Sequence, residues 1–193
     1  METISDSRKS RIILITGGAR SGKSAFALGK AGTFEGKKLF IATAEPLDAE
    51  MQRRIETHRN ERGPGWDTAE VPLKLAETLK NQGVFYQIIL IDCLTLWLSN
   101  MMGRTAETGD GDDRVVEAID TLVHSLLDMQ RPPQRIIGSA SIYIVSNEVG
   151  MGIVPDNRAA RTFRDMAGRL NQKVARIADE VYLMVCGLPL QIK

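Results

Sequence analysis

The chain has 193 residues, a length that fits one domain around a single hydrophobic core. Its 43% hydrophobic and 25% charged content is ordinary for a soluble globular protein, and its net charge of +1 argues against the broad positive field of a nucleic-acid-binding protein. Apolar runs are of strand length, which predicts no membrane span. The polar leader 1–10 lacks the apolar stretch of a signal peptide, so we expect a cytoplasmic protein with a polar N-terminal extension.

Strand-like and helical segments alternate from residue 11 to the end. In chain order we predict a strand at 11–18, a helix opening at 24–30, a strand at 38–44, helices at 47–61 and 72–83, a strand at 86–92, a helix from 93, a mobile surface loop at 103–113, a helix at 114–130, an irregular connector at 131–140, a strand at 141–147, a helix at 156–179, a strand at 180–187 and an edge strand at 188–193. This alternation predicts an α/β fold, a mostly parallel sheet flanked by helices, as one domain over 11–193.

The cysteines and one of the two histidines give no sign of chemistry. Cys93 and Cys186 follow apolar runs without metal-type spacing, so we expect two buried free thiols. His124 falls on the polar face of the 114–130 helix, opposite its valine and leucine stripe, and is predicted to be solvated and without a catalytic role.

The segment "GGARSGKS" carries the first clear function. Gly17, four residues and then Gly22-Lys23-Ser24 match the phosphate-loop pattern in full, between a buried strand and a helix. Its glycines let backbone N–H groups converge on phosphate oxygens at a helix N-terminus. Lys23 would reach the β- and γ-phosphates, and the Ser24 hydroxyl would ligate Mg²⁺. The pattern predicts a P-loop nucleotide-binding protein.

Asp92 ends the predicted strand "IILID", which is the position of a Walker B acid that holds Mg²⁺ directly or through water. An aspartate there can also be only a helix cap. Its combination with the phosphate loop favours the metal site.

The second half contains "SNEVGMGIVPDNRAARTFRDMAGRLNQKVA", a glycine-containing loop followed by a helix whose arginines lie largely off the apolar stripe. An amphipathic helix with a solvated basic face explains the arginines by themselves. With "ITGGARSGKS", "IATAE", "RRIETHRNERG", "IDCLTLWLSN" and this segment, the chain resembles the bifunctional adenosylcobinamide kinase/adenosylcobinamide-phosphate guanylyltransferase family from Arg11 onward.

That resemblance implies a RecA-like P-loop fold, a homotrimer and two reactions of cobalamin biosynthesis. In the first, ATP or GTP phosphorylates the aminopropanol hydroxyl of adenosylcobinamide. In the second, GMP is transferred from GTP to adenosylcobinamide phosphate, giving adenosylcobinamide-GDP and pyrophosphate. Mg²⁺ is the expected cofactor, and no nucleic acid is expected as a partner. The segments 1–10, 103–113 and 131–141 lie outside the resemblance.

The resemblance assigns His58, which precedes Arg59, as the guanylylated histidine. A neutral imidazole can displace pyrophosphate and form a phosphoramidate, which splits one displacement into two. An unperturbed pKa of about 6.5 leaves the ring largely neutral in the cytoplasm. His58 also lies three residues after Ile55, at the border of the apolar face of its helix. A partly exposed surface histidine is the alternative.

The resemblance extends the nucleotide site beyond the phosphate loop. The predicted nucleotide-binding set, with Lys23 and His58 as the catalytic residues, is Gly17, Gly18, Ala19, Arg20, Ser21, Gly22, Lys23, Ser24, Thr43, Ala44, Glu45, Arg59, Asn60, Glu61, Arg62, Glu70 and Asp92. Strand C-termini line the ligand crevice of open α/β sheets, and arginines can neutralise a triphosphate. Each of these residues could also be an ordinary exposed polar residue.

Two alternatives and one mechanistic question stay open at this level. A monofunctional small-molecule kinase would use only the phosphate loop and Asp92, and a regulatory P-loop module would turn over weakly. The family's two reactions require attack at the γ-phosphate and then at the α-phosphate. One phosphate loop can serve both if the nucleotide rebinds differently or if the histidine helix moves. Glu148 and the glycines of 150–152 are our hypothesis for the corrinoid side.

Overall fold

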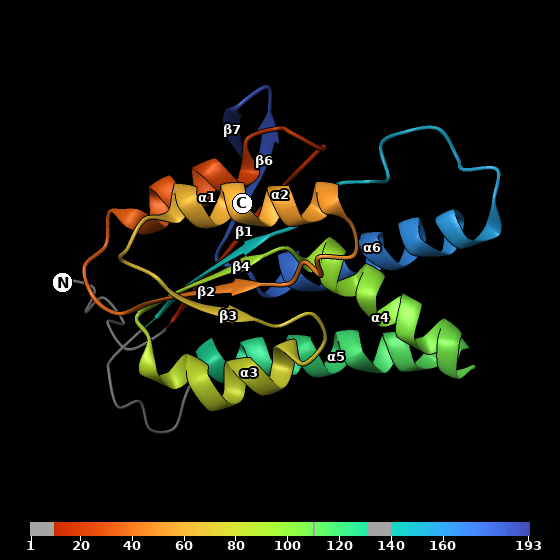
Figure 1. Cartoon of the computed structure of the whole chain (residues 1–193), viewed down its shortest axis with the longest axis horizontal. Helices are drawn as coiled ribbons and strands as arrows, with labels where there is room; N and C mark the ends of the chain where they lie inside the picture. The colour runs from red at the N-terminus through yellow and green to blue at the C-terminus, as the bar shows by residue number, and fades with distance from the viewer. Residues whose placement is uncertain (1–9, 110, 131–139) are drawn as a thin grey trace, which may run out of the picture.

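The computed structural model describes residues 10–109, 111–130 and 140–193, without the side chains of residues 54, 58, 60 and 61. Its centre is a seven-stranded sheet in the order β3-β2-β4-β5-β1-β6-β7 (Figure 1). Adjacent strands are parallel except the antiparallel pair β6–β7. The strands are β1 Arg11–Gly17, β2 Lys38–Ala42, β3 Asp67–Glu70, β4 Ile88–Asp92, β5 Ser141–Val145, β6 Glu180–Val185 and β7 Leu188–Gln191.

Two helical layers cover the sheet. The helices are α1 Lys23–Gly32, α2 Ala49–Arg62, α3 Leu75–Gln82, α4 Leu94–Thr108, α5 Gly111–Gln130 and α6 Arg158–Ile177, with a short 3₁₀ turn Gly83–Phe85. One buried cluster joins the sheet to α3, α4, α5 and α6, and a second joins the opposite face to α1. None of these described helices is long and apolar enough to cross a bilayer.

The interior strand β1 shows why this sequence forms a sheet buried on both faces. Ile12 and Leu14 belong to the cluster under α3–α6, whereas Ile13 and Ile15 belong to the cluster under α1. Alternate side chains of a strand point to opposite faces, so an unbroken apolar run requires a helix layer on each side. The predicted α/β fold with a mostly parallel sheet is confirmed.

The predicted surface loop at 103–113 is wrong. The helix α4 continues to Thr108, and α5 already begins at Gly111. Gly109 adopts a left-handed conformation with φ 74° and donates its N–H to the Thr105 carbonyl, which closes α4. The acidic residues that follow stand in the first turn of α5, where they favour the positive end of the helix. The glycine and acidic residues therefore mark helix ends.

One further prediction needs correction, one strand was missed, and two segments lie outside the described residues. Cys93 is buried and Cys186 is exposed in the turn between β6 and β7, although both are free thiols as predicted. The strand β3 was not predicted, because three of its four residues are polar and exposed at the sheet edge. The leader 1–9 and the connector 131–139 lie outside the described residues.

The last strands are tied to the sheet by a cluster of charges. Glu180 on β6 pairs with Arg11 and with Lys30 of α1, and it accepts a hydrogen bond from the Tyr182 hydroxyl at 2.6 Å. Burial by itself would raise the pKa of Glu180, but the Tyr182 and Lys30 hydrogen bonds and the two positive charges together hold it below its usual value. The Lys30 ammonium also lies 4.8 Å from the Tyr182 ring centroid.

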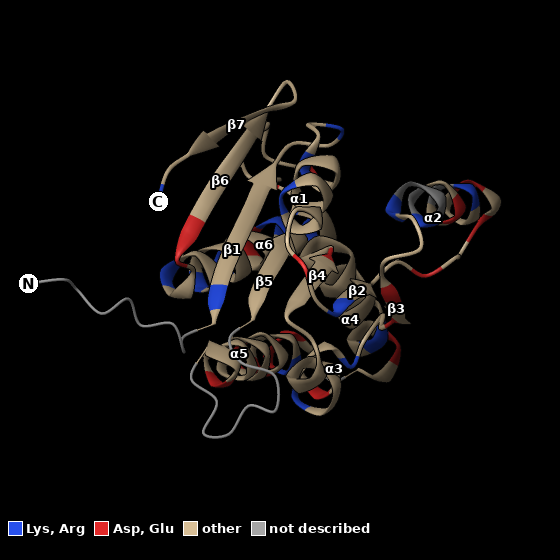
Figure 2. Ribbon diagram, turned by 90° about the vertical axis from the view of Figure 1, so that its left-hand side faces the viewer, with Lys and Arg blue, Asp and Glu red and all other residues tan. Residues whose placement is uncertain are grey.

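The helix α2 stands apart from both layers. Figure 2 shows it outside the body of the molecule, carried on two connecting segments. None of its described side chains is buried, and its apolar residues Met51 and Ile55 are only half-buried. The Asp48 carboxylate caps its start by accepting the Met51 N–H at 2.7 Å. This is the helix that carries His58.

Candidate active site

The phosphate loop has the backbone that its glycines were expected to provide. Gly17 has φ 148° and Gly22 φ 91°, both outside the range that side chains readily adopt. A Cβ at Gly17 would lie 2.6 Å from the Met184 carbonyl oxygen, so this position admits only glycine. The turn between β6 and β7 supports the loop, because the Gly187 N–H donates to the Ser21 carbonyl at 3.1 Å.

Lys23 lies within this loop, only 7% exposed. Its ammonium donates to the Gly18 carbonyl at 2.5 Å and lies 3.4 Å from the Ser21 hydroxyl. Burial lowers the pKa of Lys23, and negative charge at Cys93 and Asp92 acts in the opposite sense. Burial also raises the pKa of Cys93 to about 11, so that thiol is neutral at pH 7 and Asp92 is the charge that acts on Lys23.

Asp92 and Ser24 lie on the side of the sheet covered by α1. Ile88 and Leu90 of β4 belong to the cluster under α1, so the strand alternation points Asp92 the same way. Both residues are half-buried, and both offer an oxygen ligand. The parallel pairing of β4, β5 and β1 brings their C-terminal ends to one edge, where the phosphate loop begins. The structure thus places the predicted metal-binding pair beside the loop.

Thr43, one of the predicted nucleotide contacts, makes hydrogen bonds within the protein. It is fully buried, and its hydroxyl accepts the Cys93 N–H at 2.8 Å and donates to the Cys93 carbonyl at 2.7 Å. Its own N–H donates to the Asp92 carbonyl, and its carbonyl accepts the Asn100 amide at 2.8 Å. All its polar groups are engaged within the protein, so Thr43 joins β2 to the end of β4. Ala44 and Glu45, which follow it, are half-buried.

The C-terminal half of α2 is attached to the sheet edge by its arginines. Arg59 pairs with Glu70 of β3, and the Arg62 guanidinium lies 3.8 Å from the Phe40 ring centroid and 3.3 Å from the Thr68 hydroxyl. Burial, and next the charge of Arg59, lower the pKa of Arg62, while Asp92 and Glu70 act in the opposite sense. Three predicted nucleotide contacts therefore lie together at the β3 edge of the sheet, and β2 separates this edge from the strand that ends in Asp92.

The other members of this stretch are placed only by their backbone. His58, Asn60 and Glu61 belong to α2, but their side chains lie outside the described residues. His124, by comparison, is exposed on α5, with Nδ1 2.7 Å from the Asp120 carbonyl oxygen. The predicted solvated face of that helix is confirmed.

The loop after β5 is fixed to the phosphate loop by its first residues. The Glu148 N–H donates to the Gly17 carbonyl at 2.9 Å, and the Glu148 carboxylate accepts the Gly150 N–H at 2.9 Å. Beyond these, the loop exposes apolar side chains: Met151 is 78%, Ile153 96% and Val154 60% exposed.

A buried polar network under this loop was not predicted. The Asn171 amide oxygen accepts the Ser146 hydroxyl at 2.6 Å, and its NH₂ donates to the Asn147 carbonyl at 3.1 Å. Asn147 in turn donates to the Thr95 hydroxyl at 2.8 Å. The one available signal was an asparagine next to the apolar stripe of a helix, which is weak. The network joins α4, β5 and α6 where the loop starts.

Comparison with known proteins identifies the family of this chain. A sequence model described as "cobinamide kinase / cobinamide phosphate guanyltransferase", CobU, matches residues 13–192. The chain belongs to this family. It is 41% identical over 187 residues to the bifunctional adenosylcobalamin biosynthesis protein CobU of Escherichia coli K12, covering 94% of this chain and 99% of that protein. It is 40% identical over 180 residues to the bifunctional adenosylcobalamin biosynthesis protein CobP of Pseudomonas aeruginosa PAO1, covering 93% and 96%.

Solved structures give the fold of this family member. A type III secretion system ATPase from pathogenic bacteria aligns with a TM-score of 0.54 and 14% identity, covering 91% of this chain and 51% of that one. An ATP synthase subunit, NeqB of Nanoarcheaum equitans, aligns with a TM-score of 0.50 and 13% identity, covering 91% and 45%. These alignments and the strand order confirm the RecA-like P-loop fold that the resemblance implied.

Proposed function

We propose that this family member phosphorylates adenosylcobinamide and then transfers GMP from GTP to the product through His58. The match over residues 13–192 supports the pair of reactions. The observation that carries the proposal is the backbone bond from Glu148 to Gly17, which attaches the loop most specific to the family directly to the phosphate loop. A protein that only bound nucleotide would not need the loop after β5 to be attached to its phosphate loop.

For the kinase reaction, the phosphate loop holds the triphosphate of ATP or GTP and Lys23 contacts its β- and γ-phosphates. The hydroxyl oxygen of the substrate attacks the γ-phosphorus, the bond to the β–γ bridging oxygen breaks, and the nucleoside diphosphate leaves. Because Lys23 is largely excluded from water, its charge acts more strongly on the phosphates than it would in bulk solvent.

The oxygen ligands Ser24 and Asp92 fit Mg²⁺, which prefers oxygen and binds proteins through one or two side chains plus phosphates and water. Within the described part of the chain, no group of three or more His, Cys, Asp or Glu side chains could hold a metal, so the nucleotide would complete the coordination. The ion would neutralise charge on the phosphates.

For guanylyl transfer, a ring nitrogen of His58 attacks the α-phosphorus of GTP, and the bond to the bridging oxygen breaks to release pyrophosphate. The other ring nitrogen loses its proton, which leaves a phosphoramidate whose imidazole ring is neutral and whose phosphoryl group keeps one negative charge. A phosphate oxygen of adenosylcobinamide phosphate then attacks the same phosphorus, the P–N bond breaks, and the imidazole is reprotonated. Arg59 and Arg62 follow His58 in α2 by one and four residues. Glu70 lies on the edge strand β3.

The weak packing of α2 supports a moving histidine helix. Its ion pair with β3 joins two side chains that are more than half exposed, so the pair contributes little to stability. A short reorientation of α2 could therefore bring His58 to the α-phosphate after the kinase step, and the same phosphate loop would serve both reactions.

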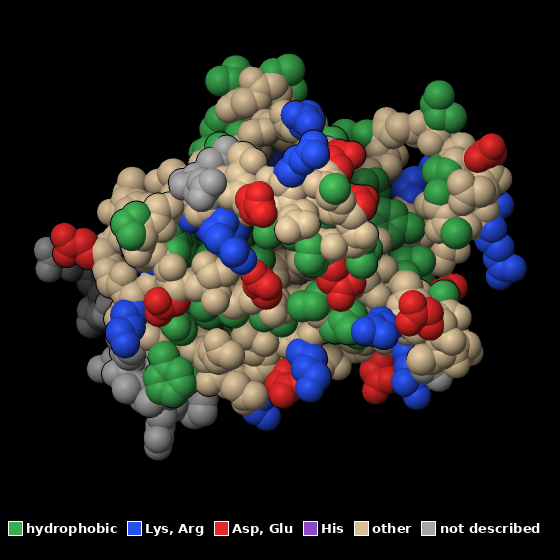
Figure 3. All heavy atoms as spheres, in the orientation of Figure 1, with side chains coloured by type: hydrophobic (Ala, Val, Ile, Leu, Met, Phe, Trp, Pro, Cys, Tyr) green, Lys and Arg blue, Asp and Glu red, His purple; other side chains and the backbone are tan. Residues whose placement is uncertain are grey.

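The homotrimer and the cytoplasmic location belong to this proposal as well. Exposed Leu188, Leu190 and Ile192 on or after the edge strand β7 support self-association, because an exposed apolar edge favours pairing with another chain. Light scattering of the purified protein measures the assembly. In Figure 3, Lys and Arg alternate with Asp and Glu over the visible face, which supports a small-molecule substrate over nucleic acid.

The test is to mix the protein, Mg²⁺ and α-labelled GTP, denature the mixture, and measure label on the chain. We expect acid-labile, alkali-stable label on the wild type and none on His58→Ala. His124→Ala is the matched control, because it removes an exposed helical histidine and should leave the label unchanged. An unlabelled wild type that still binds GTP would reduce the protein to a monofunctional P-loop kinase.

A further inference from the structure

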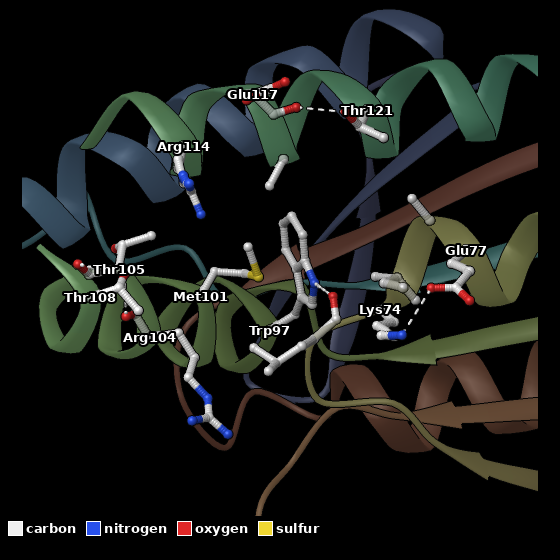
Figure 4. A pocket seen from close by; sticks show the side chains of 14 residues that line it. Lys74, Glu77, Trp97, Met101, Arg104, Thr105, Thr108, Arg114, Glu117 and Thr121 are labelled. Carbon is white, nitrogen blue, oxygen red and sulfur yellow. Dashed lines mark hydrogen bonds and ion pairs between the residues drawn. The ribbon is translucent and has the colours of Figure 1, made fainter. Parts of the chain in front are cut away.

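The helical layer opposite α1 contains two hollows. One, of about 600 Å³, lies between α3, α4 and α5. Figure 4 shows Trp97 and Met101 of α4 pointing toward α5, with Arg114 pointing back toward them. Trp97 donates its indole N–H to the Leu73 carbonyl at 2.8 Å and is 2% exposed, so this hollow has a fixed aromatic wall.

The other hollow, of about 830 Å³, lies between α4 and the first turns of α5 and α6. Its volume falls within the range of about 300–1,000 Å³ typical of small-molecule sites. Six of its lining residues show its character: Ser99, Met102, Thr105, Ala106, Ala160 and Phe163. Apolar and small side chains alternate with hydroxyl groups, and Asp112 and Arg158 add one acidic and one basic group. This mixture suits a broad ligand with apolar faces and a hydrogen-bonding edge.

Two segments connect this hollow to the phosphate loop. The helix α4 starts two residues after Asp92, and Ser99 is seven residues from Asp92, roughly 10 Å along a helix. On the other side, the loop anchored at Gly17 ends where α6 begins, at Arg158, which also lines the hollow. Figure 1 shows this cyan loop passing from the sheet edge out to the start of α6.

The loop between these points carries apolar side chains toward solvent. Met151, Ile153 and Val154 are each at least 60% exposed, which is unusual for three apolar residues within four positions. Since the loop runs from the phosphate site to the rim of the hollow, they add apolar surface along the same path.

We propose that the hollow between α4 and the start of α6, with the apolar loop 151–154 beside it, binds the corrin macrocycle of the acceptor. This inference rests on the proposed function. A corrin has apolar faces and a rim of amide groups, which match the methionine, phenylalanine and small residues and the hydroxyl groups of the hollow. Its aminopropanol arm is about as long as two extended residues, roughly 7 Å, and would span most of the roughly 10 Å that separate Ser99 from Asp92 along α4.

The occupant is a small molecule and not a second copy of the chain, because the lining is concave and rich in small residues. The hollow is also attached at both sides to the phosphate site, where a reacting hydroxyl must arrive. The aromatic-walled hollow of Figure 4 lacks this second attachment, since none of its lining residues belongs to α6 or to the loop before it. It therefore serves as an internal comparison.

The test fills each hollow with an indole. Ala106→Trp and Ala159→Trp place it in the proposed site from α4 and from α6, both at exposed positions. Thr121→Trp is the matched control, because Thr121 is exposed and lines the other hollow. We expect the kinase KM for adenosylcobinamide, and its Kd by equilibrium dialysis, to rise at least tenfold in the first two and less than twofold in the control.

Self-labelling with α-labelled GTP needs no corrinoid, so it should stay unchanged in all three variants and separates this inference from the proposed function. Wild-type KM and Kd in Ala106→Trp and Ala159→Trp, with normal labelling, would overturn the corrin site alone. A wild type that neither binds nor phosphorylates adenosylcobinamide would overturn both proposals. A change of assembly mass by light scattering in Ala106→Trp would show an interface between copies and would likewise overturn the corrin site.

Discussion

The substitution Thr43→Val tests whether a buried hydroxyl holds the Asp92 end of β4 in place. Valine keeps the branched shape of threonine at this fully buried position, so the exchange leaves no large cavity. It removes the acceptor of the Cys93 N–H, at 2.8 Å, and the donor to the Cys93 carbonyl, at 2.7 Å. The perturbation is therefore confined to two backbone groups next to Asp92.

The two groups differ in what they lose. The Cys93 carbonyl keeps a second partner, because the Trp97 N–H donates to it at 3.2 Å within α4. The Cys93 N–H is left buried without an acceptor, and such a group costs about 1–3 kcal/mol. We therefore expect the free energy of unfolding to fall by about 2 kcal/mol.

Urea unfolding measures this change, provided that the m-values of wild type and variant agree. Thr121→Val is the control, because its hydroxyl also donates to a backbone carbonyl but on the surface of α5, and we expect less than about 0.5 kcal/mol. Thr43→Val with wild-type stability and weakened GTP binding would refute the positioning role. The threonine would then contact the nucleotide, as the resemblance implied.

Three other substitutions test separate parts of the molecule. Glu148→Gln should impair turnover more than GTP binding, and unchanged kcat would count against a role in the acceptor reaction. Glu70→Gln removes an ion pair with Arg59 in which both partners are more than half exposed, so unfolding free energy should change by less than about 1 kcal/mol while the Kd for GTP rises; an unaltered Kd would contradict the nucleotide contact. The lowered pKa of Glu180 means that its folded form binds protons less readily than the unfolded chain, so it adds stability above a pH of about 4.3 that is lost as pH falls below this value. Glu180→Gln should flatten the acid limb of the stability curve, and a limb as steep as that of the wild type would assign acid sensitivity to other carboxylates.

The sequence allowed good prediction wherever a local pattern matches a tertiary requirement. The strand β1 and the phosphate loop were predicted because an apolar run with terminal glycines has few other uses. The break between α4 and α5 was not, since the same glycines and acids are typical both of loops and of helix ends. Only the buried face of α4, including Thr105 at 9% exposed, distinguishes the two, and burial is a tertiary property.

In the candidate site, too, residues that belong to a local pattern were predicted, and roles that depend on long-range contacts were not. Lys23 and Asp92 follow from spacing on adjacent elements, and the structure places them within electrostatic range. Thr43 lies in a segment of the family pattern, but its orientation depends on Cys93, fifty residues away in sequence. The Ser146–Asn171 bond is equally long-range, so no local pattern could have revealed it.

The position of α2 links the fold to the two chemistries, and hydrogen exchange can measure it. Its sequence, AEMQRRIETHRNER, has two apolar side chains besides alanine, so the helix has no broad apolar face to pack on the sheet. It is held at its ends, by the Asp48 cap and by the contacts of Arg59 and Arg62. Amides of α2 should therefore exchange much faster than those of α6, whose buried stripe packs on the sheet, because helices with few buried contacts open at low free energy. Mg²⁺ and GTP should slow exchange in α2 in the wild type, since the arginines then gain the triphosphate as a partner. Protection in α2 equal to that of α6 without nucleotide would mean that the helix is fixed, and a single phosphate loop could then serve both reactions only if the nucleotide rebinds in a second position.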